Sequence, residues 1–544
     1  MVCVEKILKD SILKSLKTKN EDLSFKITVS VPIGKVKFNF CSNILFSLKG
    51  KVDEGLFLDN FLKSPYIKTA EIIKGYVNFN MSELYFYESV KNFSLESINI
   101  GKGERVNVEY CSVNPTGFLH VGHARNAILG DAIANVLSKS GFSVAKEYYV
   151  NDAGNQINLL AESVKSRYEE LKGNPTVFPE GGYLGAEIKE IAKLVGPKDS
   201  LEEIGKKSIA FFIENIKKDL LKAGVQHDSW VFESNVIENG YIEKAIKLLK
   251  SKDLLYEGQR EGKQVEKGEN SGETLLLLKT TEFGDDADRP LRKGDGSWTY
   301  LAPDIGYHLY KIERGFSNLI CVLGADHDSY AKRIKIAVKA LKNDIKHETP
   351  VCQMVTFNSD GKNVKFSKRK GNSIRLSELL DEVSKDIVRF MILSKKPGTP
   401  FIFDFGKAVE VSMQNPVFYV QYACARAHSV LRNYGKSNCE IYENCEALSY
   451  SEYQNLIVLC KEWPSVLAES VKTLSVHNIV NYLIKLAEKF HFLWQAGKTD
   501  ANKKFILENN SKESSARMAI INVFIVVIKD ALNTLGIQAL EKMD

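Results

Sequence analysis

The sequence has no pair of cysteines in a C-x-x-C spacing, although it contains nine cysteines among its 544 residues. Close cysteine pairs of this kind supply most structural zinc sites and thioredoxin-like redox sites, so neither class of site is expected. Disulfide frameworks are typical of short secreted chains, and this chain is far longer. We therefore expect the cysteines to be small buried apolar side chains, and we expect no protein-bound zinc.

Long apolar runs are also missing. A helix that crosses a bilayer needs about 20 consecutive apolar residues, and the run at 523–528 is much shorter. The first residues contain no sustained apolar stretch of the kind that marks a signal peptide. These absences favour a cytoplasmic protein with no membrane partner.

A strong excess of one charge is absent as well. The chain has 74 Lys and Arg against 68 Asp and Glu, which gives a formal net charge of +6. Such a mild surplus permits an RNA partner, bound through a local basic patch, but does not require one. The length predicts three or four domains of roughly 100–200 residues each.

The pattern of apolar residues divides the chain into three predicted domains. Residues 1–105 combine an opening helix with alternating strand-like runs, which indicates a small α+β domain. Residues 106–409 contain the short apolar runs of a buried parallel sheet, interrupted by a mainly charged, helical insertion at about 160–290. Residues 410–544 show helical periodicity throughout, as in a helix bundle. The predicted fold class is therefore multidomain α/β, with a Rossmann-type parallel-sheet domain and an all-α C-terminal domain.

A βαβ unit is predicted directly after residue 105. The sequence favours a strand at 105–110, a helix with an apolar stripe at 124–137, and a second strand at 143–150. Further short apolar runs are expected to continue the parallel sheet, and they lie at 298–301, 319–323 and 352–355.

The segment His120-Val-Gly-His123 stands where the first of these strands turns into its helix. The first-turn N–H groups and the helix dipole attract anions, and Gly122 would let a nucleotide lie against the backbone. His120 and His123 could then donate to phosphate oxygens. A surface accident and a metal-binding pair remain open as alternatives for this motif by itself.

A basic loop lies much further along the chain, between Gly361 and Gly371, and holds five Lys and Arg residues. Flexible ammonium groups suit a departing pyrophosphate. A solvated charge run would be the ordinary explanation. The upstream histidine motif and the apolar strand that ends near Val355 favour the phosphate-binding interpretation instead.

Together, His120-Val-Gly-His123 and Lys365-Phe-Ser-Lys368 resemble the two signatures of class I aminoacyl-tRNA synthetases. Longer stretches are similar to the arginyl-tRNA synthetases, and they run over 109–127, 149–156, 295–304 and 415–423. The resemblance covers nearly the whole chain. It implies an arginine–tRNA ligase that uses ATP with Mg²⁺, takes L-arginine and arginine tRNA as partners, and acts as a monomer. The sequence departs from the commoner second signature at Phe366, which replaces Met.

The resemblance also implies roles for individual residues. Catalysis falls to His120, His123, Lys365 and Lys368. ATP binding adds Gly122, Asn126 and Ser367 to these four. His327 follows an apolar strand, so it could also contact the adenosine or ribose of ATP, although a structural histidine is the alternative. The arginine site would comprise Ser112, Asn114, Asp152, Gln156, Tyr300 and Asp304, with Asp304 facing the guanidinium, although a plain helix N-cap is the alternative for Asp304. In the C-terminal domain, tRNA would contact Tyr419, Tyr422 and Arg426, because aromatic rings beside a cation can stack unpaired bases; packing of the tyrosines between helices is the alternative.

Two other functions stay open on the sequence. A small-molecule nucleotidylyltransferase with the same histidine motif would explain the phosphate site but not the large helical C-terminal domain. A non-catalytic tRNA-binding relative would be free to lose His120, His123 or Lys368, and all three are present.

Overall fold

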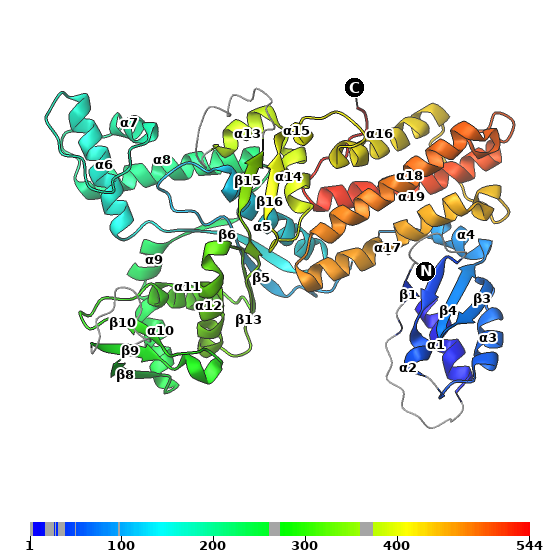
Figure 1. The fold of residues 1–544 in the computed structure, drawn as a ribbon, viewed down its shortest axis with the longest axis horizontal. Helices are drawn as coiled ribbons and strands as arrows, with labels where there is room; N and C mark the ends of the chain where they lie inside the picture. The colour runs from blue at the N-terminus through cyan, green and yellow to red at the C-terminus, as the bar shows by residue number, and fades with distance from the viewer. Residues whose placement is uncertain are drawn as a thin grey trace.

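The computed structural model places a parallel-sheet domain at the centre of an elongated molecule (Figure 1). A long helical bundle extends to one side, and the N-terminal domain lies below that bundle, in blue. The structure describes residues 4–16, 27, 29–30, 38–48, 50–95, 98–259, 273–358 and 374–543. The predicted fold class is confirmed: a multidomain α/β protein with a parallel sheet and an all-helical C-terminal region.

The central sheet has five parallel strands in the order β13-β11-β5-β6-β7. Their bounds are Lys346–Glu348, Asn318–Cys321, Arg105–Glu109, Ser143–Val150 and Ser229–Phe232. The chain leaves β5 toward β6 and leaves β11 in the opposite direction toward β13. The carboxyl ends of β5 and β11 therefore form a topological switch point, where open α/β sheets bind ligands.

Strand alternation gives the sheet two different buried faces. Val106 and Val108 point to one face and share a core with Ile128 of α5 (Val121–Lys139). The opposite face carries Leu319, which packs with Ile305 of α11 (Leu301–Glu313). Both faces are covered, as a parallel sheet requires. The predicted helix at 124–137 and the predicted strands at 105–110 and 143–150 are confirmed by α5, β5 and β6.

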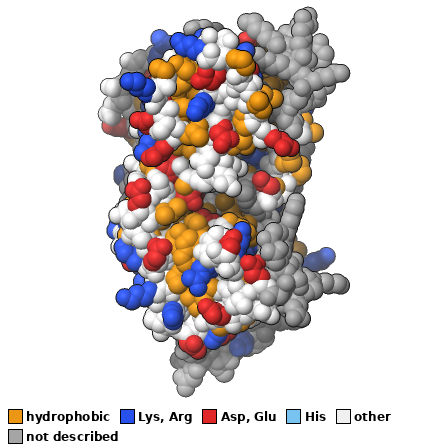
Figure 2. All heavy atoms as spheres, turned by 90° about the vertical axis from the view of Figure 1, so that its left-hand side faces the viewer, with side chains coloured by type: hydrophobic (Ala, Val, Ile, Leu, Met, Phe, Trp, Pro, Cys, Tyr) orange, Lys and Arg blue, Asp and Glu red, His pale blue; other side chains and the backbone are white. Residues whose placement is uncertain are grey.

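The insertion is helical only in its first part. Three helices, α6 (Asn155–Leu171), α7 (Ala186–Ala192) and α8 (Leu201–Lys222), are followed by β7, which pairs with β6 in the central sheet. Two further helices, α9 (Glu233–Glu238) and α10 (Tyr241–Ser251), then lead into an antiparallel three-stranded sheet of β8 (Leu255–Gln259), β9 (Thr274–Leu278) and β10 (Arg289–Arg292). The face of the molecule that carries these elements mixes acidic, basic and apolar side chains (Figure 2).

Two predictions in this region are wrong. The segment from β8 to β10 was expected to be helical, but the run at 274–278 alternates between buried and partly exposed residues and pairs on both sides. The strand predicted at 298–301 is absent, because Leu301 begins α11 and Trp298 forms only an isolated bridge with Arg292. Both errors arose from short apolar runs, which fit a strand or a helix equally well.

Several shorter elements complete the parallel-sheet domain beyond the central sheet. Two small parallel pairs join β12 (Leu323–Gly324) to β14 (Val351–Cys352) and β15 (Val355–Asn358) to β16 (Phe401–Asp404). The helices are α12 (Asp328–Leu341), α13 (Leu376–Glu382), α14 (Lys385–Leu393) and α15 (Phe405–Ala408), together with the 3₁₀ turns η2 (Thr280–Phe283) and η3 (Ala325–His327).

The N-terminal region contains an antiparallel sheet in the order β1-β2-β4-β3. Its elements are α1 (Val4–Lys14), β1 (Val29–Ser30), β2 (Phe40–Ser42), α2 (Ile44–Ser47), α3 (Glu54–Leu62), β3 (Ile67–Ile73), β4 (Tyr76–Met81) and α4 (Glu83–Lys91). Phe57, Phe61 and Phe79 form its core and are fully buried.

The C-terminal bundle consists of α16 (Pro416–Tyr434), α17 (Ser451–Thr473), α18 (His477–Thr499) and α19 (Ser511–Thr534), with the turns η4 (Glu446–Ser449) and η5 (Ala501–Lys503). Arg389 of α14 connects the bundle to the parallel-sheet domain: its guanidinium lies 2.6 Å from Asp131 of α5 and 2.8 Å from the carbonyl of Leu535. Among the described helices, none has both the length and the apolar composition that a membrane crossing needs.

Candidate active site

The two histidines of the first motif meet at the N-terminus of α5. His120 is the N-cap, with its Nδ1 accepting from the backbone N–H of Gly122 at 3.1 Å. His123 stands in the first turn, and its Nδ1 accepts from the N–H of His120 at 3.3 Å. The two rings stack with centroids 3.5 Å apart. Each imidazole thus accepts one of the two hydrogen bonds that form a capping box at the N-terminus of α5.

These contacts decide the protonation of both rings. Burial lowers the pKa of His120, and burial together with the neighbouring His120 lowers the pKa of His123 to about 3. Both rings are therefore neutral at pH 7. Since each Nδ1 accepts a hydrogen bond, the proton must sit on Nε2. The helix N-terminus consequently carries two neutral N–H donors, which suit an anion that gains charge during a reaction.

Gly122 is required by the packing of this cap. A Cβ atom at this position would lie 2.9 Å from Cε1 of His120 and 3.0 Å from its Nδ1. Any other residue would therefore push the ring of His120 out of its hydrogen bond. The close approach that calls for glycine is to the histidine of the same motif.

Asn126 connects the two strands of the switch point. Its Oδ1 accepts from the N–H of Cys111, directly after β5, at 2.7 Å, and its Nδ2 donates to the carbonyl of Val322, directly after β11, at 2.8 Å. Both polar ends of the side chain are engaged with backbone. Asn126 therefore fixes the relative position of the two strand ends between which a ligand would lie.

A group of carboxylates lies beside this switch point, around Asp304. Burial and the nearby Glu109 and Glu233 raise the pKa of Asp304 to about 8, although Lys311 opposes the rise. Burial and Asp152 raise the pKa of Glu233 to about 7. Such shifts arise where several acids crowd together without enough positive charge. The site thus has the electrostatic character of a receptor for a cation.

Three of the neighbouring residues were not identified as site residues from sequence. Lys311, which is fully buried on α11, holds Glu109 at the end of β5 with an Nζ–Oε2 distance of 2.5 Å. Glu233 is the first residue of α9, far from the motifs in the sequence. Glu109 lay inside a stretch similar to the arginyl-tRNA synthetases, so it had a sequence signal. Glu233 had none, because its importance comes only from its proximity to Asp304 and Asp152.

Tyr149 of β6 lies among the same acids. Burial and the negative charges of Glu233, Asp304, Glu109 and Asp152 raise the pKa of its hydroxyl. Its ring stacks on Tyr307 at 4.2 Å, and among the described residues its hydroxyl has no hydrogen-bond partner. A buried hydroxyl without a partner is costly, and it offers a further polar contact to a ligand in this group.

Ser112 and Asp152 hold this wall of the site in place. The hydroxyl of Ser112 donates to Glu109 Oε1 at 3.0 Å and accepts from the N–H of Tyr149, also at 3.0 Å. Asp152 accepts from the N–H and the hydroxyl of Ser234 at 2.9 and 2.6 Å, which anchors the start of α9. The structure therefore places both residues beside the acids, with most of their polar atoms engaged by protein.

Asn114 and Gln156 meet although 42 positions separate them: the Asn114 Nδ2 donates to the Gln156 Oε1 at 2.8 Å. Asn114 is in the loop after β5, and Gln156 is in the first turn of α6. This amide pair leaves the Asn114 oxygen and the Gln156 nitrogen available for a polar ligand. Both residues belong to the predicted arginine site, and the structure brings them into direct contact.

Asp304 is not the N-cap of its helix. Tyr300 occupies that position, and Asp304 lies in the first turn, so the alternative of a plain cap is wrong. Tyr300 is 58% exposed, and its hydroxyl accepts from Arg333 of α12 at 2.7 Å. Asp304 therefore does not cap the helix and lies beside Glu109 and Glu233, whereas Tyr300 lies at the surface one helical turn away.

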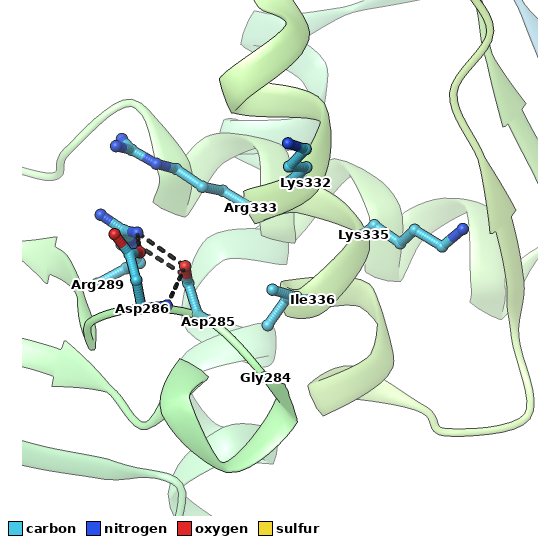
Figure 3. Close-up of a pocket in the computed structure, with 8 residues that line it drawn as sticks. All are labelled: Gly284, Asp285, Asp286, Arg289, Lys332, Arg333, Lys335 and Ile336. Atoms are coloured by element: carbon cyan, nitrogen blue, oxygen red, sulfur yellow. Dashed lines mark hydrogen bonds and ion pairs between the residues drawn. The ribbon is translucent and has the colours of Figure 1, made fainter.

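Arg333 also lines an open hollow of about 610 Å³ between α12 and the turn after η2 (Figure 3). On its other side, Arg289 is held by Asp285 through two contacts of 2.8 Å and by Asp286. Lys332 and Lys335 project from the same helix. The residues that line the hollow include none of those predicted from sequence. One of them, Arg333, is hydrogen-bonded to Tyr300, which belongs to the predicted arginine site.

Part of the predicted site lies outside the described residues. Lys365, Ser367 and Lys368 fall within 359–373, and the side chain of His327 is likewise outside the description, although its backbone belongs to η3. The strand β15, which pairs with β16, ends at Asn358, immediately before the segment 359–373.

The C-terminal residues expected to contact RNA form a ring cluster on α16 and α18. Arg426 lies over the ring of Tyr422 at 4.1 Å and over that of Trp494 at 4.8 Å. The ring of Tyr419 lies 4.5 Å from His491. Next to His491, Phe492 is 62% exposed. The cluster combines a cation with partly exposed aromatic faces, which suits the stacking of unpaired bases.

Comparison with known families agrees with this arrangement. Residues 89–217 and 237–397 match the family described as "tRNA synthetases class I (R), catalytic domain", and residues 420–543 match the "DALR anticodon binding domain". An "Arginine--tRNA ligase" of Ehrlichia chaffeensis is 42% identical over 514 residues, which cover 90% of this chain and 88% of that protein. One from Rickettsia bellii is 38% identical, with 96% of each chain covered.

Solved structures show the same fold. The arginyl-tRNA synthetase of Thermus thermophilus superposes with a TM-score of 0.74 over 99% of this chain and 100% of that one. The sequence identity is 18%, so this likeness concerns the fold alone.

Proposed function

Because the chain belongs to the arginyl-tRNA synthetase family, we propose how its own residues perform the ATP-dependent ligation of L-arginine to arginine tRNA. The reaction has two steps. The carboxylate of arginine attacks the α-phosphorus of ATP, which forms arginyl-adenylate and releases pyrophosphate. A ribose hydroxyl of the terminal tRNA adenosine then takes the arginyl group, and AMP leaves. Neither step needs a nucleophile from the protein, so catalysis consists of positioning and charge stabilisation.

The observation that carries the proposal is the crowding of Asp304, Glu233 and Glu109 at the carboxyl end of β5, the strand that leads to the histidine motif. A guanidinium remains charged at every accessible pH, and paired carboxylates are its natural partners. Lys311 satisfies only part of the negative charge in this group. Arginine supplies the missing cation, with Asp304 as the principal partner and Tyr300 at the entrance. A neutral amino acid would leave these acids uncompensated.

The remaining assignments follow the geometry. His120 and His123 donate from Nε2 to the phosphates at the N-terminus of α5, and Gly122 keeps their cap intact. The amides of Asn114 and Gln156 bind the α-amino and carboxylate end of arginine. Ser112 acts by positioning Glu109 and Tyr149. Asp152 acts by positioning Ser234 at the start of α9, and Asn126 acts by positioning the ends of β5 and β11. Lys365, Ser367, Lys368 and His327 complete the nucleotide site.

In this proposal the C-terminal helical bundle binds the tRNA. Tyr419, Tyr422 and Arg426 offer stacking faces and a positive charge to unpaired bases, supported by the contacts of Arg426 with Tyr422 and Trp494. Tyr422→Ala should raise the KM for tRNA. Tyr442→Ala is the matched control, because Tyr442 belongs to the same bundle and pairs with Glu440 away from the cluster.

The proposal extends to three further properties. Mg²⁺ accompanies the ATP phosphates. The chain acts as a monomer in the cytoplasm. Its functional domains are residues 1–105, 106–409 and 410–544. The first domain contacts tRNA as well. The alternatives of a small-molecule nucleotidylyltransferase and a non-catalytic relative are not favoured, because the family matches span both the catalytic region and the bundle.

The direct test is ATP–pyrophosphate exchange with each of the twenty amino acids, with and without tRNA. Arginine alone should support exchange. Asp304→Asn should raise the KM for arginine strongly and leave the KM for ATP nearly unchanged. The control is Asp219→Asn, which alters another buried acid with a raised pKa that lies on α8 outside the site. Unchanged arginine kinetics in Asp304→Asn would remove this residue from the pocket.

A further inference from the structure

Three buried side chains with metal-binding atoms converge behind the arginine pocket. His308 comes from α11, Cys321 from the end of β11 and His347 from β13. They are 4, 5 and 3% exposed, and one ligand atom from each lies within 4.8 Å of the other two. No step of the proposed reaction uses them.

The spacing of these atoms resembles that of a tetrahedral zinc site. Zinc bonds of about 2.05 Å to nitrogen and 2.3 Å to sulfur place two nitrogens roughly 3.3 Å apart and a nitrogen roughly 3.6 Å from a sulfur. The two Nε2 atoms of His308 and His347 are 3.2 Å apart, and Cys321 Sγ is 3.9 Å from the Nε2 of His308. Two of the three spacings thus lie within a few tenths of an ångström of the zinc values, and the third, between Cys321 and His347, is at most 4.8 Å.

The orientation of His308 is that of a metal ligand. Its Nδ1 lies 2.7 Å from the carbonyl of Asp304, so Nδ1 must carry the proton and donate it. The lone pair of Nε2 therefore points toward His347 and Cys321. A ligating histidine almost always donates its second N–H to a carbonyl or carboxylate in this manner.

We propose that His308, Cys321 and His347 bind one zinc ion. Two imidazoles and a thiolate are a ligand set that suits Zn²⁺. The fourth position of the tetrahedron falls to a water molecule. Binding releases the thiol proton of Cys321 to solvent, and His347 carries its remaining ring proton on Nδ1.

The charges around the cluster accommodate the ion. Lys311 Nζ lies 3.8 Å from Cys321 Sγ and pairs with Glu109, so this ammonium faces the sulfur as a hydrogen-bond donor. Glu147, Asp304 and Glu109 all lie on the same side of the sheet, under α11. Both glutamates are already paired, Glu109 with Lys311 and Glu147 with Arg314, so the negative charge that the ion gains here is the thiolate of Cys321.

The consequence of zinc binding is local rigidity. The ion would join α11 to two strands of the central sheet at the helical turn that follows Asp304. Through the Nδ1 contact it would fix the backbone of the residue that faces the guanidinium. The C-x-x-C rule could not find this site, because its three ligands come from three separate elements.

The zinc content of the full chain, purified from zinc-supplemented cells and measured by plasma mass spectrometry, tests the proposal. We expect about one zinc per chain. Cys321→Ala should lower the content at least about tenfold. Cys460→Ala is the matched control and should keep its zinc, because Cys460 is equally buried but lies in the bundle, on α17.

Cobalt substitution of the wild-type chain keeps the test decisive if Cys321→Ala does not fold. After removal of zinc with a chelator, added Co²⁺ should give tetrahedral d–d bands and a thiolate-to-cobalt charge-transfer band. A wild-type chain that contains no zinc and develops no such band overturns the proposal. So does a folded Cys321→Ala chain that retains its zinc. Neither measurement depends on ligase activity, so the result stands apart from the proposed function.

Discussion

Arginine binding should release protons, because the acids that receive the guanidinium hold them in the free protein. The pKa of Asp304 is raised to about 8 and that of Glu233 to about 7, mainly by burial and then by neighbouring acids. A bound cation favours the ionised form of both carboxyls and so lowers both pKa values. Below pH 8, binding must therefore expel protons, and the affinity must rise with pH.

The magnitude follows from these pKa values. At pH 7 a carboxyl with a pKa of about 8 is roughly 90% protonated and one with a pKa of about 7 roughly 50%, so about 1.4 protons leave per arginine bound. At pH 8.5 the release falls to about 0.3 protons. If binding ionises both groups fully, the affinity increases about 100-fold between pH 6.5 and 8.5.

Isothermal titration calorimetry measures this release directly. Arginine is titrated into the protein at pH 7 in two buffers that differ in ionisation enthalpy, and the difference in heat gives the number of protons. Asp219→Asn should leave that number unchanged, because Asp219 lies on α8 outside the site. A release near zero with normal affinity would refute the reasoning, since both acids would then be ionised before arginine arrives.

Three other changes have defined outcomes. Asp304→Asn should raise the melting temperature of the free protein at pH 8 but not at pH 4: the folded-state pKa of about 8 exceeds the unfolded value of roughly 4, so wild-type stability falls as pH rises between them. A melting curve with equal shifts at both pH values would contradict this. Gly122→Ala should lower kcat at least about tenfold by displacing the His120 ring, whereas Gly117→Ala, with no atom within 4 Å of its new Cβ, should not. Arg389→Met should lower the free energy of unfolding by about 3–5 kcal/mol in urea titrations, because it leaves Asp131 with only Lys146 as a partner and leaves the buried carbonyl of Leu535 without its donor; a loss below about 1 kcal/mol would be inconsistent with the buried pair.

Much of the catalytic unit could be predicted because its signals are local. The strand β5, the helix α5 and the strand β6 each follow from apolar periodicity within a short window. The motif His120-Val-Gly-His123 predicted a helix N-terminus, and the structure adds the reason for Gly122, which is the ring of His120. The bundle helices were equally visible, since each buries one long apolar stripe.

Errors occurred where local patterns are ambiguous. The run at 274–278 and the run at 298–301 are both short and apolar, and neither their length nor their periodicity separates strand from helix. Pairing with β8 and β10 decided the first run, and the start of α11 decided the second. The role of Asp304 was ambiguous for the same reason, because the first residue of α11 could not be located from sequence.

The sequence by itself determined which chemical groups the chain possesses and which short elements carry them, because both depend on neighbouring residues. Only the tertiary structure decided that Glu109, Glu233 and Asp304 would share one buried site, and that His308, Cys321 and His347 would meet behind it. The physical reason is that proton affinity and metal affinity depend on distances through space and on exclusion of water. Those quantities come into existence only when β5, β11, β13, α9 and α11 are assembled around one sheet.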